Sequence, residues 1–326
     1  MADPVTRRRL GALFGLAIAA VPAPAAAQPA ETAGTTTHIL TARETGRRYK
    51  LRIAIPAGAS RVRQPLLIVL DGQSYFNTTI EAARGMAFAG EAPPMIVVGI
   101  EPAVATVAAR VYDFTAPTVA SDLPERLHNS GAQVGGLGAF SRFLIAEVLP
   151  FIEARAPVET RCRALFGHSL AGLATLHIML ERPDMFEAFA ASSPSLWWAN
   201  RALLTRLAAA GSRPAQPVQP RLLVTVGARE QQVTAEMRAT DPARAARIER
   251  YAMVDNAERL RRLMSGPQAP ARLSFASFAD ESHASVVPGA ISRAVRFAGA
   301  CEAARDPEPI EPAPNPPTRV TLPERR

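Results

Sequence analysis

Continuous runs of apolar residues recur along the chain and are bounded by glycine, proline and polar residues. Such runs are typical of strands covered on both faces, because neither face then needs polar side chains. They predict strands over residues 65–70, 94–100, 164–166 and 222–227. A short strand with a turn is further expected over 189–194, and the last strand over 273–278. An earlier segment, 38–55, alternates between apolar and polar positions and predicts one or two antiparallel strands.

The segments between these strands carry apolar residues at helical spacing. They predict helices over 75–88, 139–154, 173–178, 203–209, 241–264 (in two pieces) and 290–303. Residues 101–137 lack a clear period and predict a long irregular segment, which in a compact domain is usually functional or mobile. Strands alternate with helices without a break in composition. The sequence therefore predicts one α/β domain over 38–303, with a doubly wound, mostly parallel sheet and helices on both faces.

The two ends of the chain lack this alternation and are expected to lie outside the domain. Arg7, Arg8 and Arg9 precede a short apolar run and an Ala-rich stretch, so residues 1–27 are expected to be a cleaved export signal. The arginines favour the twin-arginine machinery, with Sec export as the alternative. We expect residues 28–37 to be a flexible lead and 304–326 a disordered, Pro-rich tail.

The apolar run of the signal is too short and too rich in alanine for a good membrane span. After cleavage we therefore expect no stable membrane insertion and a periplasmic location, in a Gram-negative bacterium. The formal net charge of the 326 residues is +8, and the basic residues are nearly all scattered arginines. This excess is compatible with an anionic small-molecule substrate and, without a cluster, disfavours a nucleic-acid partner.

The stretch Gly167-His168-Ser169-Leu170-Ala171 joins a predicted strand to a predicted helix. A serine with small residues two positions before and after it, on such a turn, is typical of a nucleophile elbow. The turn is so sharp that larger flanking side chains would collide with the strand or the helix. Ser169 is the predicted nucleophile, and the amide of Leu170 is a predicted oxyanion donor at the helix N-terminus.

A serine hydroxyl needs a base, and His283 follows the last predicted strand. The order serine, acid, histidine is that of the α/β-hydrolases, so the acid is sought after the preceding strand, where Glu230 lies. Glu230 would orient the imidazole and stabilise its protonated form. Asp255 and Asp280 are alternatives, and a Ser–His dyad is a further possibility.

Other residues that follow predicted strands are expected at the same rim, because the site of such a sheet lies at the carboxyl ends of its strands. Gly72 or Gln73 is expected to supply the second oxyanion amide. Arg110 is a candidate for binding an anion, and Trp197 and Trp198 are candidates for stacking on an aromatic acyl group. At least one tryptophan is expected instead to pack under the irregular segment.

The chain has two cysteines, Cys162 at the start of the elbow strand and Cys301 near the end of the last helix. A helix that follows a strand runs back toward the strand starts, so both cysteines are expected at one edge. We predict a disulfide between them, the alternative being two separate buried thiols. No spacing of a zinc site and no phosphate loop occurs, so we expect no metal and no cofactor.

Six motifs carry a family resemblance and occur in one order. They are Asp71-Gly72-Gln73, Arg110-x-x-Asp113-Phe114-Thr115, Gly135-Gly136 before a helix with Phe140 and Phe143, Gly167-His168-Ser169-Leu170-Ala171-Gly172, Ser193-Pro194-Ser195-Leu196-Trp197-Trp198 and His283-x-Ser285-Val286.

Together these motifs resemble the esterase D-like putative esterases of the α/β-hydrolase superfamily, above all the branch that hydrolyses ferric enterobactin and salmochelin. The resemblance spans roughly residues 38–300. It implies Ser169 as nucleophile, His283 as base, backbone donors near Gln73 and Leu170, and a siderophore trilactone or related ester as substrate. The chain departs from the family at Ala171, where glycine is usual, and alanine is still small enough for the elbow.

The leading hypothesis is therefore a serine carboxylic-ester hydrolase that acts through an acyl-enzyme on an enterobactin-like siderophore. Three alternatives stay open. They are a catalytically idle periplasmic siderophore-binding protein, an esterase for feruloyl or other acyl esters, and an acyltransferase on the same scaffold.

Overall fold

A computed structural model describes residues 34–57, 62–124, 127, 133–210, 219–266 and 269–304, and these residues belong to one compact unit. The expected export signal 1–27, most of the lead and the tail from residue 305 lie outside the described residues. The first strand begins at Thr35, so the last residues of the expected lead are part of the sheet.

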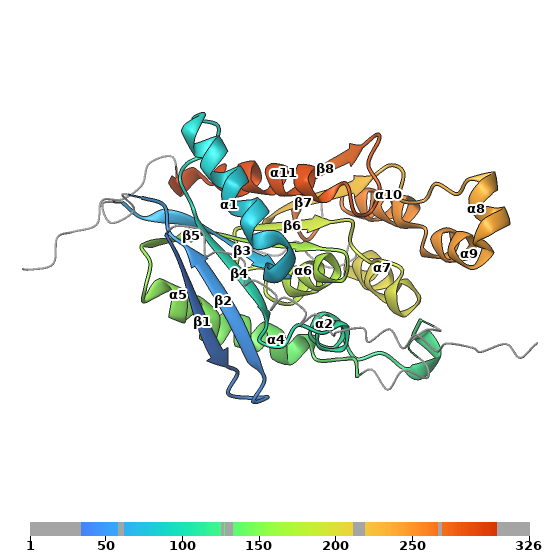
Figure 1. Ribbon diagram of the computed structural model, residues 1–326, viewed down its shortest axis with the longest axis horizontal. Coiled ribbons are helices and arrows are strands. Elements are labelled where there is room, and N and C mark those ends of the chain that lie inside the picture. Colours follow the sequence, from blue (N-terminus) through green and yellow to red (C-terminus); the bar gives the residue numbers. More distant parts are fainter. Residues whose placement is uncertain are drawn as a thin grey trace, which may run out of the picture. The chain divides into compact units, whose positions relative to one another are not determined.

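An eight-stranded sheet runs through the unit in the order β1-β2-β4-β3-β5-β6-β7-β8 (Figure 1). Strands β3 to β8 run parallel to one another, whereas β2 is antiparallel to both β1 and β4. The mostly parallel sheet that the apolar runs predict is thus confirmed. The strand bounds are β1 Thr35–Thr41, β2 Arg48–Ala54, β3 Gln64–Leu70, β4 Ile96–Pro102, β5 Val158–His168, β6 Ala188–Ser192, β7 Arg221–Gly227 and β8 Arg272–Phe278.

Helices cover both faces of the sheet (Figure 1). Their bounds are α1 Gly72–Phe88, α2 Val107–Phe114, α4 Leu137–Phe143, α5 Leu149–Glu153, α6 Leu170–Glu181, α7 Trp198–Ala210, α8 Ala235–Thr240, α9 Pro242–Tyr251, α10 Met253–Leu263 and α11 Val287–Gly299. Three shorter helical turns are η2 Ala120–Asp122, the π-helical η3 Leu144–Val148 between α4 and α5, and η4 Glu302–Ala304.

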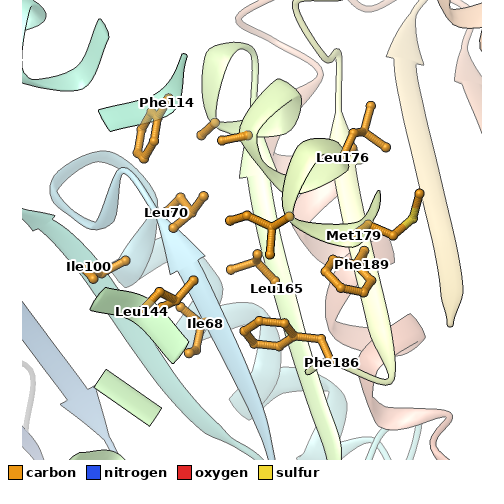
Figure 2. Packing of buried hydrophobic residues seen from close by; sticks show 14 of the residues in the cluster. Ile68, Leu70, Ile100, Phe114, Leu144, Leu165, Leu176, Met179, Phe186 and Phe189 are labelled. Carbon is orange, nitrogen blue, oxygen red and sulfur yellow. The ribbon is translucent and has the colours of Figure 1, made fainter. Parts of the chain in front are cut away.

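Alternate side chains of β3 enter two different cores, as the pleat of a strand requires. Leu67 and Val69 pack with residues of α1 and α11 on one face. Ile68 and Leu70 pack on the other face with residues of α2, α4, α6 and α7. Figure 2 shows part of this second core, where Leu165 and Phe189 of the sheet lie beneath Met179 of α6. Both faces of β3 are buried, which is why its run from Pro65 to Leu70 is continuously apolar, whereas the edge strands β1 and β8 are partly exposed.

The segment 101–137 is not irregular throughout, because it contains α2 and the short turn η2. Thr106 caps α2, since its side chain accepts a hydrogen bond from the amide of Ala109. The helical region 241–264 does divide in two, at Ala252, whose φ is 45°. The elbow strand is much longer than its apolar centre suggests: the polar residues Glu159, Arg161 and Arg163 extend β5 toward its start.

Candidate active site

Ser169 occupies a strained turn between β5 and α6. Its φ is 62° and its ψ is −118°, a region that residues with a side chain rarely adopt. A Cβ at Gly167 would lie 2.3 Å from the carbonyl oxygen of Ala171, so the position two before the serine cannot carry a side chain. Ala171 itself is fully buried. The local structure thus has the form of the predicted elbow.

The structure brings Ser169, His283 and Glu230 into one hydrogen-bonded chain. The Nε2 atom of His283 lies 3.1 Å from the Oγ of Ser169, and its Nδ1 lies 2.6 Å from Oε2 of Glu230. With Nδ1 facing a carboxylate, the proton of a neutral imidazole sits on Nδ1 and leaves Nε2 as an acceptor. This is the tautomer that can accept the proton of Ser169.

The carboxylate of Glu230 is fully buried and held from three sides. Its Oε1 accepts hydrogen bonds from the amide of Gly227 at 2.7 Å and from the hydroxyl of Ser193. The alternative acids lie elsewhere: Asp255 binds the side chain of Gln231 at the surface, and Asp280 is exposed. Among the three candidates, Glu230 is the carboxylate that contacts His283.

The predicted oxyanion amides lie in the first turns of two helices that follow neighbouring strands. Gly72 and Gln73 begin α1 after β3, and Leu170 begins α6 after β5. First-turn amides have no acceptor within their own helix and point toward its positive end. Because β4 and β5 flank β3 on opposite sides, this is the point where the strand order reverses, the usual position of a site in such sheets.

Arg110 contacts the two turns that carry these amides. Its guanidinium makes a salt bridge of 2.8 Å with Asp71, the buried residue that precedes Gly72, and its side chain is one-quarter exposed. It also donates to the carbonyl oxygen of His168, next to Ser169, at 3.3 Å. The sequence did not reveal this partner for Arg110, because Asp71 is 39 residues away.

The ring of His168 packs against that of His283, with 4.6 Å between centroids. Its Nδ1 lies 3.1 Å from the hydroxyl of Ser192. Burial lowers the pKa of His168 to about 3, and the nearby His283 and Arg110 act in the same direction. His168 is therefore neutral at physiological pH.

Two serines of the motif Ser193–Trp198, for which no role in the site was predicted, also contact these groups. Ser193 binds Glu230, and the Oγ of Ser195 lies 3.3 Å from the Oγ of Ser169. Both follow β6, so the rule that site residues follow strands could have found them. Ser193 adopts a left-handed backbone conformation, with φ 43°, which directs the turn across the site.

The two tryptophans have different surroundings. Trp198 is buried and donates to the Oγ1 of Thr118, so it packs under the segment 101–137, as expected for one of the pair. Trp197 stacks on Tyr251 of α9, with parallel rings 3.8 Å apart, and borders a cavity of about 550 Å³. The described lining of this cavity does not include Ser169, His283 or Glu230. The cavity is linked to them through the turn that carries both Trp197 and Ser195, the serine whose hydroxyl lies near that of Ser169.

Three arginines, Arg201, Arg247 and Arg250, also line this cavity. In the described part of the chain none of them forms a salt bridge, and the one carboxylate in the lining is that of Asp122. Residues 199–201 all have positive φ angles of 46–64°, a conformation that costs backbone energy, and Arg201 at the end of this turn lines the cavity. This cluster was not predicted, because Arg201 lies in α7 whereas Arg247 and Arg250 lie in α9, more than 40 residues further along the chain.

Cys162 and Cys301 form the predicted disulfide, with their Cα atoms 5.7 Å apart. It joins β5, which carries Ser169, to the chain just after α11. Within the described ranges no group of three or more histidine, cysteine or acidic residues is arranged to hold a metal ion. No described helix has the length and apolar character needed to cross a bilayer.

Comparison with known proteins places these features in a family. The sequence model of the family described as "Putative esterase" matches residues 42–260. The ferri-bacillibactin esterase BesA of Bacillus subtilis is 32% identical over 277 residues, which cover 81% of this chain and 89% of that protein. The siderophore triacetylfusarinine C esterase of Aspergillus fumigatus is 30% identical over 240 residues, with 70% and 79% covered.

Among solved structures, the siderophore hydrolase EstA of Aspergillus nidulans superposes with a TM-score of 0.73 at 27% identity, covering 84% of this chain and 97% of its own. The fold and the geometry at its strand ends are those of an α/β-hydrolase. The chain belongs to the putative esterase family, as the motif resemblance indicated.

Proposed function

We propose that this protein is a serine esterase that cleaves the ester bonds of a siderophore through an acyl-enzyme. The observation that carries the proposal is the hydrogen-bonded chain from Ser169 through His283 to Glu230, at a strained elbow beside two helix N-termini. This constellation activates a hydroxyl and offers donors where an oxyanion forms.

In the first step His283 takes the proton of Ser169 at Nε2 while the Oγ bonds to the ester carbonyl carbon. The amides of Leu170 and of Gly72 or Gln73 would hold the oxygen that becomes negative. The tetrahedral centre collapses as His283 returns the proton to the leaving alcohol, and water then repeats the sequence on the acyl-enzyme. Glu230 stabilises the imidazolium in both halves.

The substrate class rests on two supports. The relatives described above are named for hydrolysing siderophores. The cavity that Trp197 borders combines three arginines with the stacked pair Trp197 and Tyr251. A ferric catecholate complex is anionic and aromatic, so the arginines of this lining complement its charge and the stacked rings complement its aromatic groups. A feruloyl ester is aromatic but lacks the negative charge that would pair with the three arginines.

The test is mass spectrometry of the products from ferric enterobactin, a feruloyl ester and a short p-nitrophenyl ester, with Ser169→Ala as the matched control. We expect linear catechol-serine fragments with the unchanged protein. Turnover by Ser169→Ala should fall about a millionfold, as in related triads. Retained hydrolysis by that variant would contradict the mechanism.

The other outcomes separate the remaining hypotheses. Cleavage of the simple esters alone would keep the mechanism and discard the siderophore. Bound but intact ferric enterobactin, with no labelling of Ser169 by a fluorophosphonate, would indicate a binding protein. Transfer to an added alcohol in excess of hydrolysis would indicate an acyltransferase.

We further propose export to the periplasm of a Gram-negative bacterium. The support is the arginine-led N-terminal sequence and the Cys162–Cys301 disulfide, since such bonds persist in oxidising compartments. Cell fractionation of the full chain and of an Arg7→Lys/Arg8→Lys variant tests this. Retention of the double variant inside the cell would indicate the twin-arginine route, and normal export of that variant would indicate Sec.

A further inference from the structure

The turn Ser193-Pro194-Ser195 touches the proposed catalytic chain at both of its ends. Ser193 binds Glu230, and Ser195 lies against Ser169. The turn is also fixed to the elbow through the backbone, since the amide of Ser195 donates to the carbonyl of Ser169 at 3.0 Å. On the other side, the amide of Ser193 donates to the carbonyl of Thr225 at the end of β7.

The direction of the hydrogen bond between the two hydroxyls follows from proton counting. Ser169 has one hydroxyl proton, and the tautomer set by Glu230 makes Nε2 of His283 its acceptor. Ser195 must therefore be the donor in its contact with Ser169. Ser195 is only 2% exposed, so water competes weakly for its hydroxyl group.

We propose that Ser195 is a further catalytic residue, whose hydroxyl donates a hydrogen bond to the attacking oxygen of Ser169. The inference rests on the esterase function proposed above. As His283 removes the proton of Ser169, negative charge grows on the Oγ, and a donor already in place stabilises that charge. The proton of Ser195 stays on Ser195. The separation of 3.3 Å is long for two hydroxyls, and catalytic hydrogen bonds of this kind shorten when substrate binds.

The role differs from that of the oxyanion amides, because those donors face the oxygen of the substrate. Ser195 faces the nucleophile and acts on any acylating reagent, whatever its acyl or leaving group. Its loss should therefore appear in the rate of covalent modification and in kcat, whereas KM stays nearly unchanged.

The experiment uses the full protein with Ser195→Ala, and Ser141→Ala as the matched control for deleting a buried hydroxyl, since Ser141 lies in α4. We expect Ser195→Ala to lower kcat on a p-nitrophenyl ester, and the rate of inactivation by a fluorophosphonate, about 10- to 100-fold each. KM should change less than twofold, and Ser141→Ala should leave all three values unaltered.

Wild-type rates in Ser195→Ala, or a change confined to KM, would overturn the proposal. Thermal unfolding of each variant shows whether the fold is kept. If Ser195→Ala does not fold, Ser195→Cys, close in size and a weaker donor, replaces it with an expected loss of at least fivefold. The Ser169→Ala variant distinguishes failure of the esterase mechanism from failure of the role of Ser195. Esterase activity in Ser169→Ala would refute the mechanism. An inactive Ser169→Ala together with a fully active Ser195→Ala would refute only the role of Ser195.

Discussion

The carboxylate of Glu230 is held in one orientation by its hydrogen bonds. Its side chain has no exposed surface, and all its hydrogen bonds come from groups that fix it toward His283. A buried carboxylate is costly unless it is hydrogen-bonded, and here each oxygen has a partner. The arrangement thus orients the imidazole and holds it in the tautomer that leaves Nε2 free.

The substitution Glu230→Gln tests whether this carboxylate sets the tautomer of His283. An amide nitrogen can donate to Nδ1 and so stabilises the tautomer with its proton on Nε2, which cannot accept from Ser169. We expect kcat to fall about 10³- to 10⁴-fold on a p-nitrophenyl ester, with little change in KM. The control is Asp255→Asn, which removes the charge of the exposed alternative acid and should leave kcat unaltered. Equal losses in both variants would contradict the assignment.

Single residues could be predicted from the sequence where chain order constrains them. Ser169, Glu230 and His283 each follow a strand in the order of an α/β-hydrolase, and the structure brings them together. The position of Ser195 after β6 could have marked it as a residue of the site, but its contact with Ser169, 26 residues away, leaves no local signal in the sequence. The partner of Arg110 was missed for the same reason, since pairing between distant residues has no period.

At the scale of elements, helix α2 fixes the geometry between two turns. Through Arg110 it binds Asp71 at the start of α1 and the carbonyl of His168 at the end of β5. Asp71 is itself in a left-handed conformation, with φ 55°. Arg110 thus adds a side-chain link between the turns of Gly72 and Leu170, whose strands β3 and β5 are already paired in the sheet.

Arg110→Met tests whether this residue positions the turns or binds an anionic substrate. Loss of the cation leaves Asp71 buried without its partner, so the free energy of unfolding should fall by about 2 kcal/mol, the partial exposure of Arg110 reducing the cost of breaking a buried pair. If the turns shift, kcat falls about tenfold or more while KM is nearly constant. Denaturant unfolding and steady-state kinetics measure the two effects.

The double variant Arg110→Met/Asp71→Asn separates positioning from charge. Without the buried carboxylate, most of the stability should return, but the turns are still not joined and kcat should stay low. A rise in KM for ferric enterobactin alone, with normal kcat on a neutral ester, would instead identify Arg110 as an anion-binding residue.

Elements were predictable where one physical pattern dominates. The strands buried on both faces have continuous apolar runs, and all of these runs are strands in the structure. The start of β5 was missed because its exposed residues, such as Arg161, interrupt the run near the edge. Helix α2 was missed because, at 8 residues, it is too short to establish a period within a segment rich in proline and glycine.

At the scale of the whole molecule, the sheet buries ionisable groups whose partners are few. His177 of α6 is one of them: its Nδ1 is buried, with no hydrogen-bond partner in the described part of the protein. Burial lowers its pKa to about 4, helped by Arg206 and opposed by Glu181. Together with His168 it makes the fold sensitive to acid, because each must stay neutral while the molecule is folded.

The direction in which stability changes with pH follows from the pKa values of His177 in the folded and the unfolded chain. The unfolded chain, with a pKa near 6.5, binds a proton between pH 6.5 and 4 that the folded chain does not. The contribution of this residue to the free energy of unfolding is therefore complete above pH 6.5 and declines by about 3 kcal/mol as the pH falls to 4.

His177→Leu removes the titrating group and the unpaired nitrogen, so its unfolding free energy should exceed that of the wild type at pH 4. Above pH 7 the two proteins should show the same dependence on pH. Denaturant unfolding at fixed ionic strength measures both curves, and parallel curves from pH 7 to pH 4 would show that His177 does not account for the acid sensitivity.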